Sequence, residues 1–263
     1  MNVSIITVSL NSADTIRDTI ESVLSQTYAP IEYIVVDGAS TDGTLAVIDV
    51  YRDAISTVIS EADTGPYEAM NKGIDRATGD LIGILNSDDV YTGPDVIHKV
   101  VRCMTEQNTD GLYGDLIVVD RLSSHKVIRY WKAGPYQQGS FKFGWMPPHP
   151  TFFVKKHVYK HYGSFNTTLK NSADYELMLR FIHKQQIKLS YIPEVLVYQR
   201  TGGLSNASLR NRLRANREDR LAWTMNAMRP ALFFFIRKPL SKIKQWLAVI
   251  GAELHETPLP YQR

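Results

Sequence analysis

Apolar residues follow two periods over the first 110 positions of the chain. Four continuous apolar runs predict strands that are buried on both faces. These runs occupy residues 3–9, 31–37, 56–60 and 80–85. Between the first two runs, segment 12–26 carries its apolar residues on one helical stripe, with Ser12 placed as N-cap. This alternation predicts an α/β fold, Rossmann-like, with a mostly parallel central sheet flanked by helices.

Capping residues indicate where the other helices of this part begin and end. Asp42 is placed to open the second helix, and Pro66 to be the first residue of the third. Gly79 follows as the end of that third helix, and Pro94 begins another one.

The pattern loosens beyond residue 110. Segments 111–120 and 125–132 read as antiparallel strands, and 144–156 as a Pro-broken loop that runs into a strand. Segment 172–185 has the apolar spacing of a helix. A strand is expected over 187–200, with Pro193 as a bulge or bend because proline cannot donate to a sheet ladder.

Charge is distributed unevenly along the 263 residues, although the net charge is only +3. The first hundred residues hold 5 basic against 16 acidic side chains, whereas residues 201–263 hold 11 basic against 4 acidic. The acidic front argues against nucleic acid as a partner, since wrapping it requires a cationic face. The basic end of the chain suggests an anionic partner such as nucleic acid or a lipid surface.

A few sequence features bear on the compartment. The single cysteine, Cys103, excludes an internal disulfide and fits a reducing compartment. The N-terminus has no basic region before its short apolar run, and no run is long enough for a spanning helix. We therefore expect a cytoplasmic protein, with peripheral contact to the inner face of the cytoplasmic membrane as a further possibility.

Acidic residues follow three successive predicted strands. Asp37 ends the second strand, Glu61 and Asp63 follow the third, and Asp88 and Asp89 follow the fourth. Parallel strands deliver their carboxyl ends to one edge of the sheet, where α/β proteins bind ligands. Two interpretations are open: solvated turns with helix caps, or oxygen ligands for a hard cation such as Mg²⁺ or Mn²⁺.

The sequence lacks the motifs of several other kinds of site. The chain has no Cys/His cluster with zinc spacing, no G-x-x-x-x-G-K-[ST] loop, and no G-x-G-x-x-G after a strand. These absences argue against an ATPase and against a dinucleotide-dependent oxidoreductase.

Six segments in a fixed order resemble the family 2 glycosyltransferases, which have the GT-A fold. They are "SIITVSLN", "YIVVDGASTDGT", "SEADTGPYEAMNKGI", "GDLIGILNSDD", "PPHPTFF" and "SADYELMLRF". The resemblance implies a catalytic domain over 1–205, with a nucleotide-binding half of about 1–110 and an acceptor half of 111–205. Residues 206–263 would form a basic helical extension.

The resemblance also implies a reaction: transfer of a sugar with inversion, assisted by Mn²⁺ or Mg²⁺. The donor would be a UDP-, GDP- or dTDP-linked sugar, and the acceptor a saccharide or lipid-linked saccharide. Such enzymes serve cell-surface polysaccharide or glycolipid synthesis. The chain departs from the Q-x-x-R-W motif of processive synthases, having "QRTGGLS" instead. This departure indicates that one sugar is added per encounter.

Residue roles carry over from the motif positions of the resemblance. Asp174 would be the catalytic base, since inversion by single displacement needs one carboxylate to take the acceptor proton. Asp88 and Asp89 would hold the metal, because Asn86 occupies the first position of the family's D-x-D. Residues implied in donor binding are Thr7, Ser9, Asn11, Asp37, Asp63 and Asp88.

Further candidates have ordinary structural explanations beside the functional ones. Lys72, with Asn71, would reach donor phosphates or remain an exposed helical lysine. His149 would orient the acceptor or the diphosphate, or simply be packed. Arg200 would clamp a phosphate. For Asp174 itself, the structural alternative is a helix cap or first-turn acid.

The end of the chain and the overall function leave alternatives. A helix from Pro239 would place Leu240, Ile243, Trp246, Leu247 and Ile250 on one side, as in interfacial membrane helices. Otherwise it packs on the domain or on a second subunit. Two other functions are weighed against the transferase: a sugar-nucleotide pyrophosphorylase, whose Gly-rich opening loop is missing, and a non-catalytic lipid- or nucleic-acid-binding module.

Overall fold

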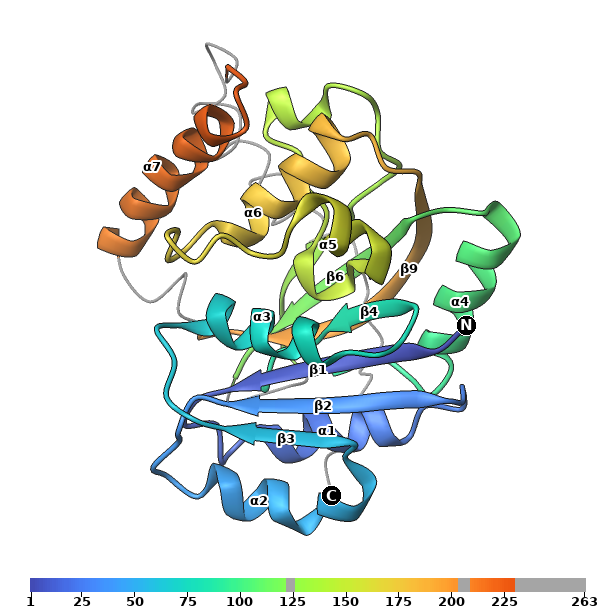
Figure 1. The fold of residues 1–263 in the computed structure, drawn as a ribbon, viewed down its shortest axis with the longest axis vertical. Coiled ribbons are helices and arrows are strands. Elements are labelled where there is room, and N and C mark those ends of the chain that lie inside the picture. The colour runs from blue at the N-terminus through green and yellow to red at the C-terminus, as the bar shows by residue number, and fades with distance from the viewer. Residues whose placement is uncertain (122–125, 203–208, 230–263) are drawn as a thin grey trace.

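A single curved sheet organises the fold in this computed structural model, which describes residues 1–121, 126–202 and 209–229 (Figure 1). The strands follow the order β3-β2-β1-β4-β8-β6-β9-β5, and β7 pairs with β6 outside this path. Their bounds are β1 Val3–Ser9, β2 Ile31–Asp37, β3 Thr57–Ser60, β4 Leu81–Ile84, β5 Asp89–Tyr91, β6 Gly111–Val119, β7 Val127–Trp131, β8 Phe153–Lys155 and β9 Leu189–Arg200.

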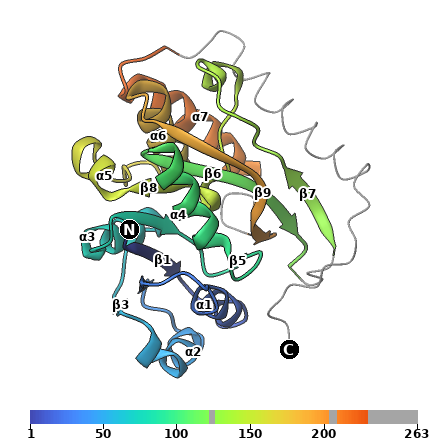
Figure 2. The ribbon, with the colours of Figure 1, turned by 90° about the vertical axis from the view of Figure 1, so that its right-hand side faces the viewer.

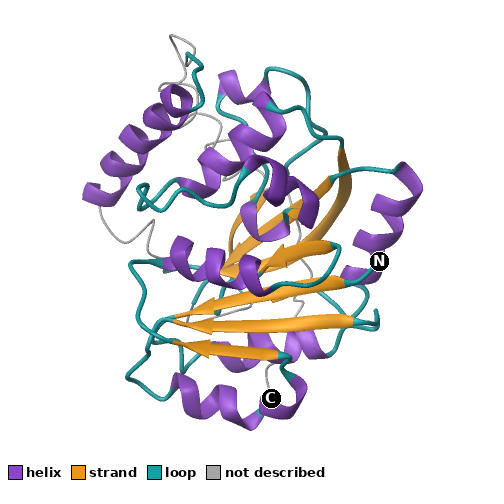
Figure 3. Ribbon diagram, viewed as in Figure 1, coloured by secondary structure: helices purple, strands orange, loops and turns teal. Residues whose placement is uncertain are grey.

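Helices connect the strands and cover the sheet (Figure 3). The α-helices are α1 Ile16–Leu24, α2 Thr44–Val50, α3 Pro66–Arg76, α4 Val96–Gln107, α5 Lys156–Tyr162, α6 Ala173–Met178 and α7 Leu209–Met225. Short turns are η1 Arg52–Ala54, η2 Ser140–Phe143 and η3 His149–Thr151, and η4 Leu179–Lys184 continues α6 with wider π-type turns.

The first four strands in the sheet order, β3-β2-β1-β4, are all parallel, as the sequence pattern predicts. Their register places Ser9 beside Asp37, and Asp37 beside Ser60, at the carboxyl ends of β1, β2 and β3. The predicted strands 3–9 and 31–37 match β1 and β2 residue for residue.

The rest of the sheet is mixed. β8 pairs antiparallel with both β4 and β6, β7 with β6, and β5 with β9, whereas β6 and β9 are parallel. The predicted bend at Pro193 is confirmed, because the β6–β9 register jumps from Ile192 to Val195. The smaller antiparallel portion therefore contains one long parallel pair.

Two hydrophobic cores lie on opposite faces of the sheet. Ile6 faces a core shared with α3, α6 and α7, while its neighbour Ile5 faces a core shared with α1 and α4. Figure 2 shows α3 and α1 on opposite sides of β1. Both isoleucines are fully buried, and each such side chain contributes about 1.5–3 kcal/mol. This double burial explains the continuous apolar runs of the parallel strands.

Helix ends follow the predicted caps in part. Asp42 accepts the Thr44 N–H at 2.9 Å, and α3 begins at Pro66. The prediction for Ser12 is wrong: Thr15 precedes α1, and the Ser12 hydroxyl lies 2.7 Å from that of Ser87.

Two further predicted ends are displaced by a few residues. α4 begins at Val96, two residues after Pro94. α3 ends before Gly79, whose own role is steric, because a Cβ there would lie 2.8 Å from the Ser4 nitrogen.

The membrane-contact prediction for residues 229–263 falls almost entirely outside the described residues. In the described ranges, no helix combines the length and the apolar character that crossing a membrane requires. The basic extension does contain α7, which packs on the first core through Ala222 and Trp223.

Candidate active site

Asp37 lies at the centre of the carboxyl edge of the parallel strands. Its carboxylate accepts hydrogen bonds from the Ser9 hydroxyl at 3.2 Å, the Ser60 hydroxyl at 2.9 Å, and both the N–H and the hydroxyl of Ser40. The residue is 0% exposed. Asp37 therefore joins the ends of β1, β2 and β3, and a nucleobase would reach it only by replacing or adding to these donors.

Asp63 is brought to the same edge by the turn after β3. One of its carboxylate oxygens accepts the Gly65 N–H at 2.8 Å. The other approaches Gly38, where an added Cβ would lie 2.8 Å from it. The absence of a side chain at Gly38 thus lets the Asp63 carboxylate lie directly over the end of β2.

Lys72 projects from α3 toward the same turn. Its ammonium group lies 2.9 Å from the Glu61 carboxylate and donates to the Ala62 carbonyl at 3.1 Å. The hydrogen bond that Lys72 donates to Glu61 raises the pKa of Lys72. Asn71 is engaged elsewhere, since its side chain exchanges two hydrogen bonds with the backbone of Phe165, so its proposed contact with phosphate is not supported.

The first-strand candidates divide by exposure. Thr7 is 0% exposed, and its hydroxyl accepts a hydrogen bond from Tyr33 at 3.1 Å. The Thr7 side chain is therefore engaged inside the protein, and its placement in a nucleobase pocket stays a prediction. Asn11 is exposed, adopts a left-handed backbone with φ 50°, and accepts the Thr41 N–H, while Ser9 contacts Asp37.

The acidic pair lies at the start of β5. Asp89 is 0% exposed, and one carboxylate oxygen accepts from the Asn86 side chain at 3.0 Å. The other oxygen is buried and has no hydrogen-bond partner of ordinary geometry among the described residues, although the Gln199 side chain on the paired strand β9 acts to lower the pKa of Asp89. Burial, followed by the neighbouring Asp88 charge, raises the pKa of Asp89 well above its ordinary value. Burial also raises the pKa of Asp88.

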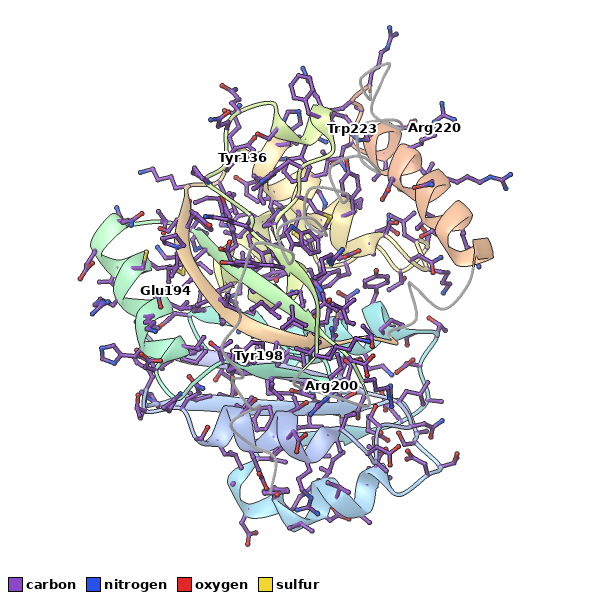
Figure 4. All side chains as sticks on the ribbon, turned by 180° about the vertical axis from the view of Figure 1, so that it is seen from behind. Tyr136, Glu194, Tyr198, Arg200, Arg220 and Trp223 are labelled. Carbon is purple, nitrogen blue, oxygen red and sulfur yellow. The ribbon has the colours of Figure 1, made fainter. Side chains whose placement is uncertain are left out.

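Two arginines provide positive charge near this pair. Arg200, at the end of β9 beyond Tyr198 (Figure 4), forms an ion pair with Asp18 and directs its other nitrogen toward the Asp88 carbonyl. Its side chain is 5% exposed. Arg121 and Arg200 both oppose the rise in the Asp88 pKa. Arg200 is thus already paired inside the protein, whereas the sequence singled it out as a phosphate clamp.

The residues fit a hard divalent cation. An unpartnered buried carboxylate oxygen beside a second carboxylate is the arrangement that a bound cation would stabilise. No group of three or more His, Cys, Asp or Glu side chains among the described ranges could hold a metal. Two carboxylates suit Mg²⁺ or Mn²⁺, which keep waters and bind substrate phosphates as well.

Asp174 lies in the first turn of α6, across from the start of α3. Its carboxylate accepts a hydrogen bond from the Tyr67 hydroxyl at 3.0 Å. Burial lowers the pKa of His149, and the charge of nearby Asp174 opposes this shift. The Nε2 atom of His149 is buried without a partner among the described residues. Asp174 and His149 thus share one part of the site.

Tyr67 is a site residue that sequence reasoning missed. Burial and the Asp174 charge raise its pKa well above the ordinary value, so its hydroxyl stays protonated and donates. Its ring stacks on Phe165 at 5.6 Å between centroids. The available signal was its position, directly after the turn that carries Asp63.

Comparison with known proteins bears on the family and the fold of the chain. The Glycosyl transferase family 2 model matches residues 4–176. An uncharacterized glycosyltransferase of Mycobacterium tuberculosis (strain H37Rv) is 34% identical over 181 residues, covering 68% of each chain. A PGL/p-HBAD biosynthesis glycosyltransferase of Mycobacterium bovis BCG is 27% identical over 208 residues, covering 77% of this chain and 78% of its own.

Solved structures show the same fold. The mannosyltransferase PcManGT from Pyrobaculum calidifontis, solved with GDP-Man and Mn²⁺, has a TM-score of 0.64 at 15% identity, covering 97% of this chain and 76% of its own. These findings favour the transferase over the pyrophosphorylase and the non-catalytic module. The chain belongs to glycosyl transferase family 2 and has the GT-A fold.

Proposed function

We propose that the chain transfers a hexosyl group from a nucleotide diphosphate sugar to an acceptor hydroxyl, with inversion and with help from a divalent cation. The observation that carries this proposal is the unpartnered, buried carboxylate oxygen of Asp89 beside Asp88, at the sheet edge that also bears Asp37 and Asp63. A buried acidic pair without a cation is costly, and a donor diphosphate with its cation would relieve that cost.

Asp174 is the proposed base. In a single displacement, the acceptor oxygen forms a bond to the anomeric carbon as the bond from that carbon to the diphosphate oxygen breaks. The electron pair leaves with the diphosphate, and the acceptor proton passes to the Asp174 carboxylate. The Tyr67 hydroxyl, 3.0 Å away, orients this carboxylate. Asp88 and Asp89 would hold Mn²⁺ or Mg²⁺, which supplies positive charge to the departing diphosphate.

Donor binding is assigned to the parallel half and its edge. Ser9, Asn11, Asp37 and Asp63 lie where strand ends meet, which suits a nucleoside. Lys72 would face the phosphates once its contact with Glu61 is exchanged. His149, near Asp174, would contact the diphosphate or the acceptor. Arg200 would stabilise the acidic pair through its positive charge. The donor would be UDP-, GDP- or dTDP-linked.

The acceptor is proposed to be a saccharide or a lipid-linked saccharide in cell-surface polysaccharide or glycolipid synthesis. A relative named for PGL/p-HBAD biosynthesis supports this class. The reaction would then take place at the inner face of the cytoplasmic membrane, with the C-terminal tail in peripheral contact with lipid.

A donor panel tests the proposal. Hydrolysis and transfer are measured for UDP-, GDP- and dTDP-linked hexoses with Mn²⁺, with Mg²⁺, and with EDTA. We expect one nucleotide series to be turned over, and EDTA to abolish turnover until the cation is restored. Turnover of no donor in any condition, or turnover unaffected by EDTA, would contradict the proposal or its cation requirement respectively.

A further inference from the structure

Helix α7 lies beyond the end of the family match at residue 176, yet it packs against α6, the helix that carries Asp174. The sequence places α7 in a basic extension separate from the catalytic domain. In the structure, Trp223 is 1% exposed and belongs to the same core as α3 and α6. Figure 4 shows Trp223 and Arg220 on this helix.

Glu218 of α7 contacts the backbone that leads into α6. One of its carboxylate oxygens accepts the N–H of Asn171 at 2.7 Å and that of Ser172 at 3.1 Å. The other lies 3.2 Å from Arg214. Glu218 is 8% exposed, so these charge-assisted hydrogen bonds are largely screened from water.

This contact acts at the N-terminal end of α6. Ser172 precedes α6 but forms no side-chain capping bond, since its hydroxyl donates to the Ala215 carbonyl at 3.2 Å. The first N–H groups of a helix have no partner within the helix, and a negative charge at this end is stabilising. Glu218 accepts the Ser172 N–H together with the Asn171 N–H before it, so it fixes the backbone that enters α6.

The residues after Asp174 are also held by α7. The Trp223 indole N–H donates to the Tyr175 hydroxyl at 2.9 Å, and the Asn226 side chain donates to the Glu176 carboxylate at 2.8 Å. Contacts from α7 thus flank Asp174 on both sides along the chain.

We propose that Glu218 is a positioning residue for Asp174, and that the catalytic unit extends through α7. The inference rests on the proposed role of Asp174 as the base. Fixing the Asn171 and Ser172 N–H groups fixes the first turn of α6, and with it the direction of the Asp174 carboxylate. A displacement of about 1 Å in a reacting group costs roughly 100-fold in rate.

The test compares E218A and E218Q with the wild type in the full chain, using the donor and cation that the panel identifies. E218A should lower kcat about 10- to 100-fold and leave the donor KM within about 2-fold, because the donor half is untouched. E218Q retains one carbonyl acceptor, so its kcat should fall less than that of E218A, by about 2-fold. A wild-type kcat in E218A, or a rise in KM alone, overturns the inference.

Loss of stability is controlled by V100A. Val100 is fully buried in α4, in the core on the opposite face of the sheet, and its truncation lowers Tm without contact to α6. An equal loss of kcat in V100A at a matched fall in Tm would overturn the inference. If E218A fails to fold, the test rests on E218Q. The inference predicts that the kcat of E218Q falls by about 2-fold or more, and a wild-type kcat would overturn it.

Failure of the inference is distinguishable from failure of the proposed function. Loss of transfer in D174N together with a wild-type E218A refutes only the role of Glu218. Retained transfer in D174N refutes the role of Asp174 as base, whatever E218A does.

Discussion

Asp37 and Asp174 are held in place in opposite ways. Asp37 receives its hydrogen bonds from Ser9, Ser40 and Ser60, all at the ends of adjacent parallel strands or the turn that follows. Asp174 depends on Tyr67, 107 residues away in the sequence, and on its neighbours' contacts with α7. The donor half is thus built from local strand ends, whereas the proposed base is oriented by helices distant along the chain.

Because of this difference, we expect substitutions in the two regions to have different effects. Changes at the donor edge should act on folding and donor binding, because the sheet itself is joined there. Changes around Asp174 should act on the rate of transfer while leaving the sheet intact.

The largest expected effect is that of D174N. Removing the base should lower transfer about 10²- to 10⁴-fold. Donor binding, measured as the rise in Tm at saturating nucleoside diphosphate and Mn²⁺, should match the wild type. Retained turnover would move the base to another residue, and lost binding would place Asp174 in the donor half.

The next largest effect is expected for D89N. Loss of a cation ligand should reduce turnover about 100-fold at fixed Mn²⁺. The same change should raise the Tm of the metal-free protein by about 2–4 °C, because it removes a buried charge beside Asp88. A metal-free Tm below that of the wild type would show that the Asp89 charge is already compensated within the fold.

The acidic pair also predicts a pH dependence. Burial raises the pKa of both carboxyls, so they take up protons at a higher pH than an ordinary aspartate. Protonation competes with the cation, and Mn²⁺ affinity should fall as the pH drops through these raised values. The folded protein favours the protonated form of the acidic pair. The free energy of unfolding of the metal-free protein should therefore fall as the pH rises through these raised pKa values. Calorimetric titration with Mn²⁺ across pH checks the first trend, and the Tm of the metal-free protein across the same pH range checks the second.

A smaller effect is expected for Y67F. Losing one hydrogen bond to the Asp174 carboxylate should lower kcat about 2- to 10-fold with the donor KM unchanged. Y33F is the matched control, because Tyr33 is also buried but bonds to Thr7. A wild-type kcat in Y67F, or a rise in the donor KM alone, would contradict the assignment.

The smallest effect on turnover is expected for S60A at the donor edge. It removes one of the hydrogen bonds to Asp37 and should lower the free energy of unfolding by about 0.5–1.5 kcal/mol. The kcat of the folded enzyme should stay within about 2-fold of the wild type. Urea unfolding followed by circular dichroism, together with turnover at low temperature, separates the two readouts.

Sequence reasoning succeeds where local patterns decide the structure. The burial of β1 and β2 on both faces gives continuous apolar runs. The acids Asp37, Asp63 and Asp88 follow strands of the parallel part of the sheet. The edge that they share could therefore be predicted. The donor-binding role of Thr7 stays a prediction from the motif alone, because its buried hydroxyl accepts a hydrogen bond from Tyr33.

The surroundings of Asp174 and of the acidic pair could not be predicted to the same depth. Tyr67, Arg121 and Glu218 act through contacts between elements far apart in the sequence, and neither period nor capping pattern reports such contacts. The membership of α7 in the catalytic unit is hidden for the same reason: its polar composition resembles a detached extension, while its few apolar residues complete the core.

The most direct test of the division between the two halves is a crystal structure with the accepted nucleotide sugar and Mn²⁺, in D174N to prevent turnover. We predict anomalous scattering from Mn²⁺ at Asp88 and Asp89, in contact with the donor diphosphate. The anomeric carbon should face residue 174. A cation bound away from the acidic pair, or a sugar directed away from α6, would contradict the account.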